Sequence, residues 1–240
     1  MRAKMLLPSF VLLIGSQAVA QSTQPKVHLG ASFIVAEPQQ EFGNYVSTSL
    51  GGSINALWTP QPESALGIRF EGGVINYGHE TQRIPFSSRA NRVDVRQTTN
   101  NMMAFVHAGP QFTWMRGPVR PYVAPSVGLT YIATMTSLSG NGQESFASNT
   151  HQKDANLSFS ATGGVYIAVL RGRVPVALDV STRYMHNGTA SYLIEGSIQD
   201  NPDGSISFDP IRSRANMLTF HVGVSVGIVD DDAKGRDNDD

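Results

Sequence analysis

The feature of this sequence that most constrains its fold is a repeated alternation of apolar residues with small or polar ones. In the last of eight such stretches, Phe220, Val222 and Val224 alternate with His221 and Gly223. Because successive side chains of a β-strand point to opposite faces, each stretch predicts a strand with one apolar face. The predicted strands cover residues 27–35, 49–58, 66–74, 104–114, 122–131, 157–169, 174–184 and 218–228.

A soluble sandwich also alternates, so further features must separate it from a barrel in a membrane. The second face of each stretch is rich in Gly, Ser and Thr, which suits the narrow lumen of a small barrel. Several stretches reach about ten residues, the length that a tilted transmembrane strand needs. Only 15% of the residues are charged, which is low for a soluble protein. The sequence therefore favours an eight-stranded antiparallel up-and-down transmembrane β-barrel.

The links between the predicted strands alternate in length. Links 59–64, 116–120 and 171–173 are short, whereas 37–46, 78–100, 136–155 and 186–215 are longer. Outer-membrane barrels have short periplasmic turns and long extracellular loops. With an even number of antiparallel strands, all the long links fall on one side, as this class of barrel requires.

Aromatic residues are placed where the two membrane interfaces are expected. Trp58 and Trp114 end the second and fourth predicted strands on the apolar face, which puts both at the periplasmic interface. Tyr131 and Tyr184 lie near the outer ends of strands that run in the opposite direction. Barrels collect aromatic side chains in girdles at these two levels, so we assign all four to the interfaces.

The two ends of the chain differ in character from its body. Arg2 and Lys4 precede an apolar run over 6–15 and a cleavage pattern at 18–20, which predicts a signal peptide over residues 1–20. The run is too short for a spanning helix. The barrel is then expected over 21–229, followed by a disordered acidic periplasmic tail over 230–240.

A resemblance to a known family supports this architecture. The stretch 120–131, RPYVAPSVGLTY, looks like the fifth-strand pattern of small opacity-protein and OmpA-like outer-membrane barrels, and 220–228 is similar to their last strand. The resemblance implies the barrel fold and a location in the bacterial outer membrane. These families commonly end on an aromatic residue that the assembly machinery reads, whereas this sequence continues into Asp230. Either a segment around Phe220 replaces that signal, or the assembly route differs.

Four charged residues stand out because they lie within predicted strands. Arg69 and Glu71 belong to the third strand, and Asp179 and Arg183 to the seventh, all on the lumen face. The third and seventh strands face each other in a ring of eight, and buried charges require partners. We therefore expect one lumen charge network that plugs the barrel, the alternative being a gated pore or a proton-linked site.

Other groups give weaker signals of chemistry. His28, His107 and His221 share the lumen face but fall on separated strands, so we expect no metal site. His186 occupies a rim position like that of a lipid A deacylase, but Gly188 stands where a serine is needed, and Ser191 and Glu195 follow in a loop. The turn-forming segment 200–205 is rich in oxygen ligands that would suit calcium, and turn chemistry explains it equally well. No cofactor is expected.

These observations leave three classes of function. The leading one is a structural or surface-interaction barrel in contact with outer-membrane lipid, inserted by the barrel-assembly machinery, with an extracellular partner reached through its long loops. The second is a carrier of small hydrophobic molecules, and the third is a lipid-modifying enzyme. We expect no enzymatic activity. The formal net charge of −1 offers no basic field for nucleic acid, which excludes that class of partner.

Overall fold

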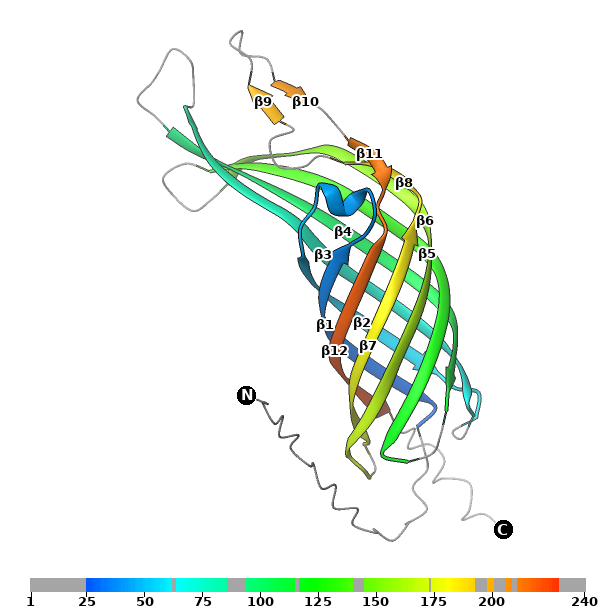
Figure 1. The fold of residues 1–240 in the computed structure, drawn as a ribbon. Helices are drawn as coiled ribbons and strands as arrows, with labels where there is room; N and C mark the ends of the chain where they lie inside the picture. Colours follow the sequence, from blue (N-terminus) through cyan, green and yellow to red (C-terminus); the bar gives the residue numbers. More distant parts are fainter. Residues whose placement is uncertain are drawn as a thin grey trace, which may run out of the picture.

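The computed structural model describes residues 25–61, 64–85, 94–114, 117–139, 145–172, 174–192, 198–200, 206–208 and 211–228. Within these ranges, eight strands close into an antiparallel barrel, as predicted (Figure 1). Each strand pairs with its neighbours in the chain, and β1 pairs with β12 to close the ring. The barrel strands are β1 (Val27–Pro38), β2 (Ser49–Trp58), β3 (Leu66–Pro85), β4 (Asp94–Thr113), β5 (Val119–Ser139), β6 (Ser145–Leu170), β7 (Val176–Asn187) and β12 (Met217–Ile228).

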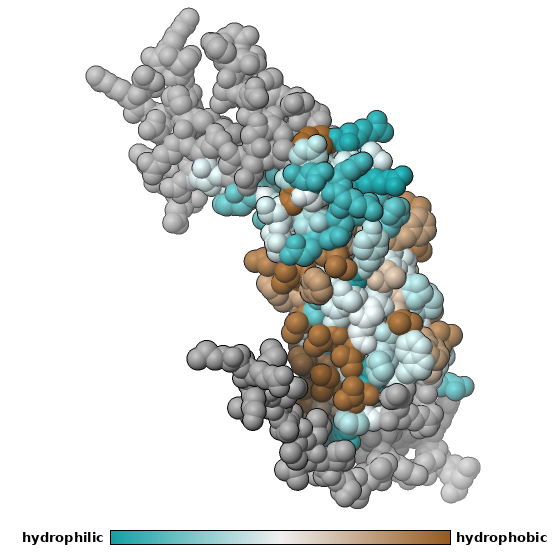
Figure 2. Space-filling model, in the orientation of Figure 1, coloured by the Kyte–Doolittle hydropathy of each residue, from teal (hydrophilic) through white to brown (hydrophobic). Residues whose placement is uncertain are grey.

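Large apolar side chains point outward all around the barrel wall. Ile54, Val106 and Leu129 are between 61 and 71% exposed, while their polar neighbours Asn55, His107 and Thr130 are buried. On the face that Figure 2 shows, hydrophobic residues lie along the barrel wall among residues of intermediate hydropathy, and hydrophilic ones gather towards the end with the long links. Such a wall is stable only against lipid, and a closed barrel leaves no backbone edge unpaired there. The fold is therefore a transmembrane β-barrel of the outer-membrane type.

The short links lie at one end of the barrel, which we call the turn end, and the long links at the other, which we call the loop end (Figure 1). No helix among the described residues is long and apolar enough to cross a membrane.

The loop end differs from the expectation in one respect, because much of the predicted loops 78–100 and 136–155 is strand. Strands β3 to β6 contain 20, 20, 21 and 26 residues, about twice the 9–11 that cross a bilayer. Their pairing continues through Pro85 with Asp94 and through Ser139 with Ser145. In these outer parts of β3 to β6 the sequence no longer alternates between apolar and polar residues. The alternation therefore gave no sign that they are strands.

The remaining long links also carry short elements. The first contains the 3-10 turn η1 (Phe42–Asn44). The last contains β8 (Thr189–Tyr192), β9 (Ile198–Asp200), β10 (Ile206–Phe208) and β11 (Ile211–Arg214), which pair as β8 with β11 and β9 with β10. The predicted signal peptide over 1–20 and the tail over 230–240 lie outside the described residues, as do Glu195 and 201–205 of the rim candidates.

Candidate functional site

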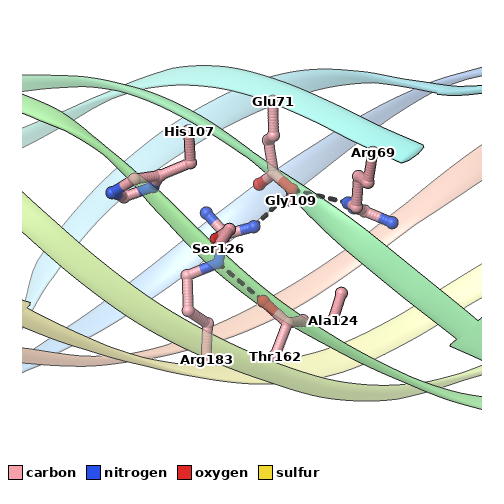
Figure 3. Close-up of a pocket in the computed structure, with 8 residues that line it drawn as sticks. All are labelled: Arg69, Glu71, His107, Gly109, Ala124, Ser126, Thr162 and Arg183. Carbon is pink, nitrogen blue, oxygen red and sulfur yellow. Dashed lines mark hydrogen bonds and ion pairs between the residues drawn. The ribbon is translucent and has the colours of Figure 1, made fainter.

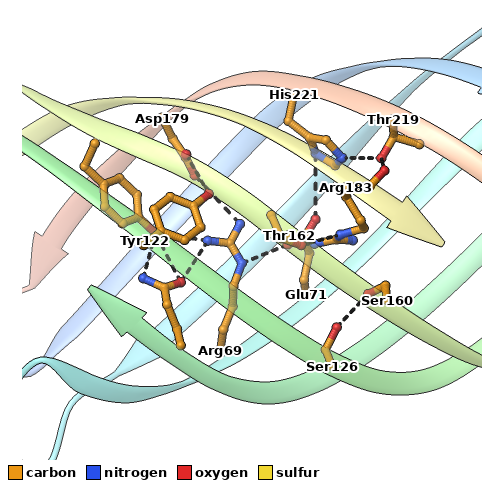
Figure 4. Close-up of polar contacts among 12 residues, drawn as sticks. Arg69, Glu71, Tyr122, Ser126, Ser160, Thr162, Asp179, Arg183, Thr219 and His221 are labelled. Carbon is orange, nitrogen blue, oxygen red and sulfur yellow. Dashed lines mark hydrogen bonds and ion pairs between the residues drawn. The ribbon is translucent and has the colours of Figure 1, made fainter. Parts of the chain in front are cut away.

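The four charged residues singled out in the strands meet at the centre of the lumen (Figure 4). Arg69 Nε donates to Glu71 Oε2 at 2.9 Å, and its Nη2 lies 3.7 Å from Asp179 Oδ2. Arg183 reaches across from β7 and donates from Nη2 to the same Glu71 oxygen. Each of these side chains is at most 5% exposed. Strands β3 and β7 thus hold two cations and two anions in one buried, neutral cluster.

Uncharged groups from β4, β5 and β6 complete this cluster. Tyr122 donates its hydroxyl to Asp179 Oδ1 at 2.9 Å, and Arg69 Nη1 donates to Tyr166 Oη at 3.0 Å. Arg69 Nη1 also reaches Gln111 Oε1 at 3.3 Å. Arg183 Nε donates to Thr162 Oγ1 at 2.9 Å.

Our sequence analysis did not include Gln111, Tyr122, Thr162 and Tyr166 in the network. The sequence did contain a signal for these residues, because they are large polar side chains on a lumen face that otherwise carries mostly small residues. These groups provide the extra hydrogen bonds that a buried ion pair needs to offset desolvation.

An aromatic pair lies in the lumen next to the charges, on the side of the turn end. Tyr122 and Tyr166 stack with ring centroids 4.6 Å apart and an interplanar angle of 21°. The Arg69 guanidinium lies 5.6 Å from the centroid of the Tyr122 ring. Gly164 makes this packing possible, because a Cβ there would approach Tyr122 Cζ to 2.7 Å. The polar centre therefore stands on an aromatic floor.

The three lumen histidines do not come together. His107 Nε2 lies 2.9 Å from Ser158 Oγ, and His221 Nε2 lies 2.8 Å from Thr219 Oγ1. His221 Nδ1 is 3.9 Å from Glu71 Oε1, and His28 lies at the turn end of β1. Among the described residues, no group of His, Asp or Glu is arranged to hold a metal ion. Two of the histidines are bound to hydroxyl groups at the edge of the charge cluster.

A small cavity lies beside the contacts that Glu71 makes with Arg69 and Arg183 (Figure 3). Its volume is about 10 Å³, and its lining includes Glu71, His107 and Arg183. Each of these residues carries one buried polar atom without a hydrogen-bond partner: Glu71 Oε1, His107 Nδ1 and Arg183 Nη1. A volume of this size accommodates about one water molecule. The arrangement suits a hydrated plug rather than a channel or a ligand pocket.

The loop-end half of the lumen contains a large apolar cluster, which our sequence analysis did not predict. Buried residues from six barrel strands fill it, including Ile34, Ile75, Met103, Phe105, Ile132, Met185 and Met217. The sequence signal for this cluster lay near the outer strand ends. There, consecutive residues such as Met217 and Leu218 are both apolar, so both faces of the strand are apolar. We call this cluster the apolar layer; it lies between the charge cluster and the loop end.

The link between β1 and β2 covers the apolar layer. Phe42 of η1 is fully buried and packs edge-to-face against Tyr192 of β8 at 4.9 Å and against Tyr77 at 5.6 Å, between ring centroids. The Gln39 backbone N–H donates to the Asn216 carbonyl oxygen, and the Asn216 side-chain amide donates to Gln40 Oε1. Burial raises the pKa of the Tyr192 hydroxyl, which shares a 2.8 Å hydrogen bond with Ser213. We call Gln39–Val46 the cap.

The four interface aromatics all lie on the outer face. Trp58, Trp114, Tyr131 and Tyr184 are between 39 and 45% exposed. Trp114 packs edge-to-face on Phe112, with ring centroids 4.7 Å apart. Trp58 ends β2 and Trp114 follows β4, at the turn end, while Tyr131 and Tyr184 lie towards the loop end.

The rim candidates for catalysis are not assembled among the described residues. His186 is exposed near the loop end of β7 and has no hydrogen-bond partner there. The backbone N–H of Ser191 donates to Asp154 Oδ2 at 3.0 Å. The described part of this rim therefore offers no nucleophile bonded to a base.

Comparisons with known proteins find likeness in the fold alone. No family model and no curated protein matches the chain. Neisserial surface protein A is 15% identical to this chain, with a TM-score of 0.48. The match covers 85% of this chain and 97% of the chain of that protein. Ail, the attachment invasion locus protein of Yersinia pestis, is 10% identical, with 85% and 99% covered and a TM-score of 0.44.

The N-terminal β-barrel domain of Pseudomonas aeruginosa OprF is 12% identical, with 85% and 100% covered and a TM-score of 0.34. TM-scores below 0.5 give these likenesses no weight for function, and the barrel is established by its own hydrogen-bond ladder. The chain is thus similar to surface and outer-membrane barrels at 10 to 15% identity.

Proposed function

We propose that this protein is a bacterial outer-membrane barrel with a surface-interaction role, whose lumen is sealed and whose loop end makes the contacts. The observation that carries the proposal is the filled lumen. From the turn end upward, it holds the Tyr122–Tyr166 pair, the charge cluster around Glu71 and the apolar layer beneath the cap. The cavity of about 10 Å³ within the cluster is far too small to pass a solute.

The loop end supports the second half of the proposal. Strands β3 to β6 continue as a paired sheet beyond the barrel wall, on the side away from the cap (Figure 1). A sheet that no lipid requires is costly to order unless it does something in water. On the other side of the loop end, near β8 and β11, Figure 2 shows a gathering of hydrophilic residues. An extracellular partner is the simplest use of such a platform.

The carrier and enzyme alternatives draw less support from the described residues. A carrier of small hydrophobic molecules needs a dry pocket or an opening in the wall. Instead, the apolar layer is packed with side chains, and a neutral ion cluster lies beneath it. We therefore propose a non-enzymatic role, with lipid contacts along the apolar outer wall and insertion by the barrel-assembly machinery.

Two experiments test the proposal. Full-length protein in planar bilayers should give no conductance and should not let small sugars equilibrate across vesicles, because the lumen is blocked. Steady single-channel currents would overturn the sealed lumen.

For the loop end, a deletion strain is complemented with full-length protein or with a variant in which a tight turn replaces 80–99. Both chains should reach the membrane in equal amounts and resist detergent equally, whereas only the full-length protein should restore surface attachment. Equal attachment with both chains would contradict the surface role, and a detergent defect confined to the trimmed chain would point to a structural one.

A further inference from the structure

Two arginines lie against the stacked tyrosine pair, and they differ in their partners. The Arg69 guanidinium is 5.6 Å from the centroid of the Tyr122 ring and donates to Glu71, as Figure 4 shows. The Arg120 guanidinium is 5.7 Å from the centroid of the Tyr166 ring. Among the described residues, Arg120 makes no hydrogen bond or ion pair, and its buried Nε has no acceptor. One arginine of the stack is therefore paired and the other is not.

The turn end of the lumen offers no acid to pair with Arg120 in the part of the chain that the structure describes. The described residues between this end and the level of Asp179 contain neither Asp nor Glu. They are 25–30, 55–61, 64–70, 108–114, 117–125, 163–172, 174–178 and 222–228. The charge cluster is neutral in itself, with two cations and two anions. Arg120 thus adds an unbalanced, partly buried positive charge, which is costly without a partner.

A second unsatisfied group faces Arg120 across the lumen. His28, on the lumen face of β1, has a buried Nδ1 without a hydrogen-bond partner among the described residues. Strands β1 and β5 are four apart in the ring of eight, so they lie on opposite sides. The two side chains are close enough for the charge of Arg120 to act on the His28 ring. Unused donors therefore point into one mouth from both sides.

The chemistry of these donors favours a phosphate group. A guanidinium binds two oxygens of a phosphate or carboxylate with parallel N–H bonds. A phosphate keeps further oxygens for an imidazole N–H, whereas a carboxylate has none left. Lys26 and Arg171 are exposed at the same end, and positive charge around a mouth raises the local concentration of anions.

We propose that the turn end of the lumen is a binding site for a soluble oxyanion of the phosphate class, held between Arg120 and His28. Arg120 donates to two oxygens of the anion, and the His28 ring donates to a third. Both side chains point into the lumen and not onto the outer wall, so the ligand enters from the water at the periplasmic mouth. The bound anion balances the charge of Arg120.

The test uses full-length protein with isotopically labelled arginine, in micelles of a neutral sugar detergent that contains no phosphate. Inorganic phosphate is added at constant ionic strength, with chloride as the reference anion. The Nε–H resonance of Arg120 should move along a saturable curve with phosphate and stay in place with chloride. The resonances of Arg69 and Arg183 should not move, because both guanidinium groups already bind Glu71. The Arg120 resonance is identified by its absence from Arg120→Lys, or through the backbone of residue 120 if that variant does not fold.

Two variants separate a built site from a general excess of charge. His28→Phe removes the imidazole and should weaken phosphate binding several-fold. Arg171→Gln is the matched control, because it removes an exposed cation at the same end and no donor from the lumen. It should leave the affinity nearly unchanged, since salt screens exposed charges. Equal weakening by the two variants would reduce the effect to surface charge and overturn the proposal.

An Arg120 resonance that moves equally with chloride, or with neither anion, would also overturn it. The titration is repeated in phosphatidylglycerol vesicles, where an unchanged curve supports the soluble ligand. A resonance already at its bound position before phosphate is added would assign the site to lipid headgroups. A curve that appears only after the aspartates of 230–240 are replaced by asparagine would assign it to carboxylates of the chain itself. Either of these two results would overturn the soluble ligand.

Discussion

Arg183 and Glu71 are 112 positions apart in the sequence, yet they form the hydrogen-bonded ion pair at the centre of the lumen. Glu71 Oε2 also accepts the Arg69 bond, so one carboxylate oxygen serves two guanidinium groups. The pair joins strands on opposite sides of the barrel, which have no backbone hydrogen bonds to each other. It therefore acts as a brace across the ring.

Breaking this brace should destabilise the barrel strongly. Arg183→Met leaves Glu71 buried beside a single cation, and we expect a loss of about 3–5 kcal/mol in the free energy of unfolding. Adding Glu71→Leu should restore part of that loss, since the second variant removes the uncompensated charge. Urea unfolding in lipid vesicles, read by gel mobility, measures both. Strictly additive effects would show that the two residues do not act together.

The contact between Arg69 and Asp179 should be coupled more weakly. Its closest N–O distance is 3.7 Å, and Arg69 keeps its bond to Glu71 when Asp179 is removed. Asp179→Ala should destabilise the barrel, and Arg69→Met in the same chain should recover a smaller share than in the Arg183 cycle. The same unfolding assay gives both couplings side by side. A larger coupling here than for Arg183 and Glu71 would reverse our ranking.

Two adjacent glycines should differ in how much the same substitution destabilises the barrel. A side chain at Gly164 meets Tyr122 and Ser181, whereas nothing lies within 4 Å of a Cβ at Gly163. Gly164→Val should therefore push Tyr122 off Tyr166 and cost about 1–3 kcal/mol by overpacking. Gly163→Val is the control and should be nearly neutral. Similar unfolding free energies for the two variants would place the tyrosine stack elsewhere.

The apolar outer wall predicts that substitutions at neighbouring residues of β12 change the stability of the barrel differently. Val224 is 48% exposed on the outer wall, while Ser225 is 5% exposed and faces the lumen. Val224→Arg should cost about 2–4 kcal/mol if the residue lies near the bilayer midplane, and Val224→Leu should be tolerated. Ser225→Leu should be destabilising, because the lumen has no room for it. Tolerance of leucine at Ser225 but not at Val224 would invert the face assignment.

The cap should control access to the apolar layer. Phe42→Ala removes the buried ring that contacts Tyr77 and Tyr192, so the cap should undock more often. A Met103→Cys probe beneath it should then react faster with a thiol reagent. Tyr45→Ala is the matched control, since Tyr45 is 49% exposed and should not change the rate. An unchanged labelling rate with Phe42→Ala would mean that another segment covers this layer.

The alternation of apolar and polar residues was enough to predict the barrel, its strand order and the lumen face of Arg69, Glu71, Asp179 and Arg183. The odd or even position of a residue along its strand fixes the face to which its side chain points. The closed ring fixes which strands oppose each other. Parity does not fix the height of a residue, because the stagger between strands is set by the whole hydrogen-bond ladder. The role of Tyr122 and Tyr166 as the floor of the charge cluster was therefore not predictable.

The loop end was least predictable for a related reason. Apolar periodicity reports an environment with two different faces, and β3 to β6 lose that environment beyond the bilayer. In the cap, Phe42 meets side chains from β3 and β8, which are distant in sequence. No local pattern encodes such a contact.

The paired continuation of β3 to β6 is a stiff extension of the barrel. From Gly78 to Pro85, eight residues remain hydrogen-bonded to β4, which at about 3.3 Å each amounts to roughly 26 Å of regular strand. A flexible loop of the same length would fold back onto the membrane and sample many heights. This extension instead keeps the residues beyond it at a fixed position relative to the barrel, which is what the proposed contact with an extracellular partner requires.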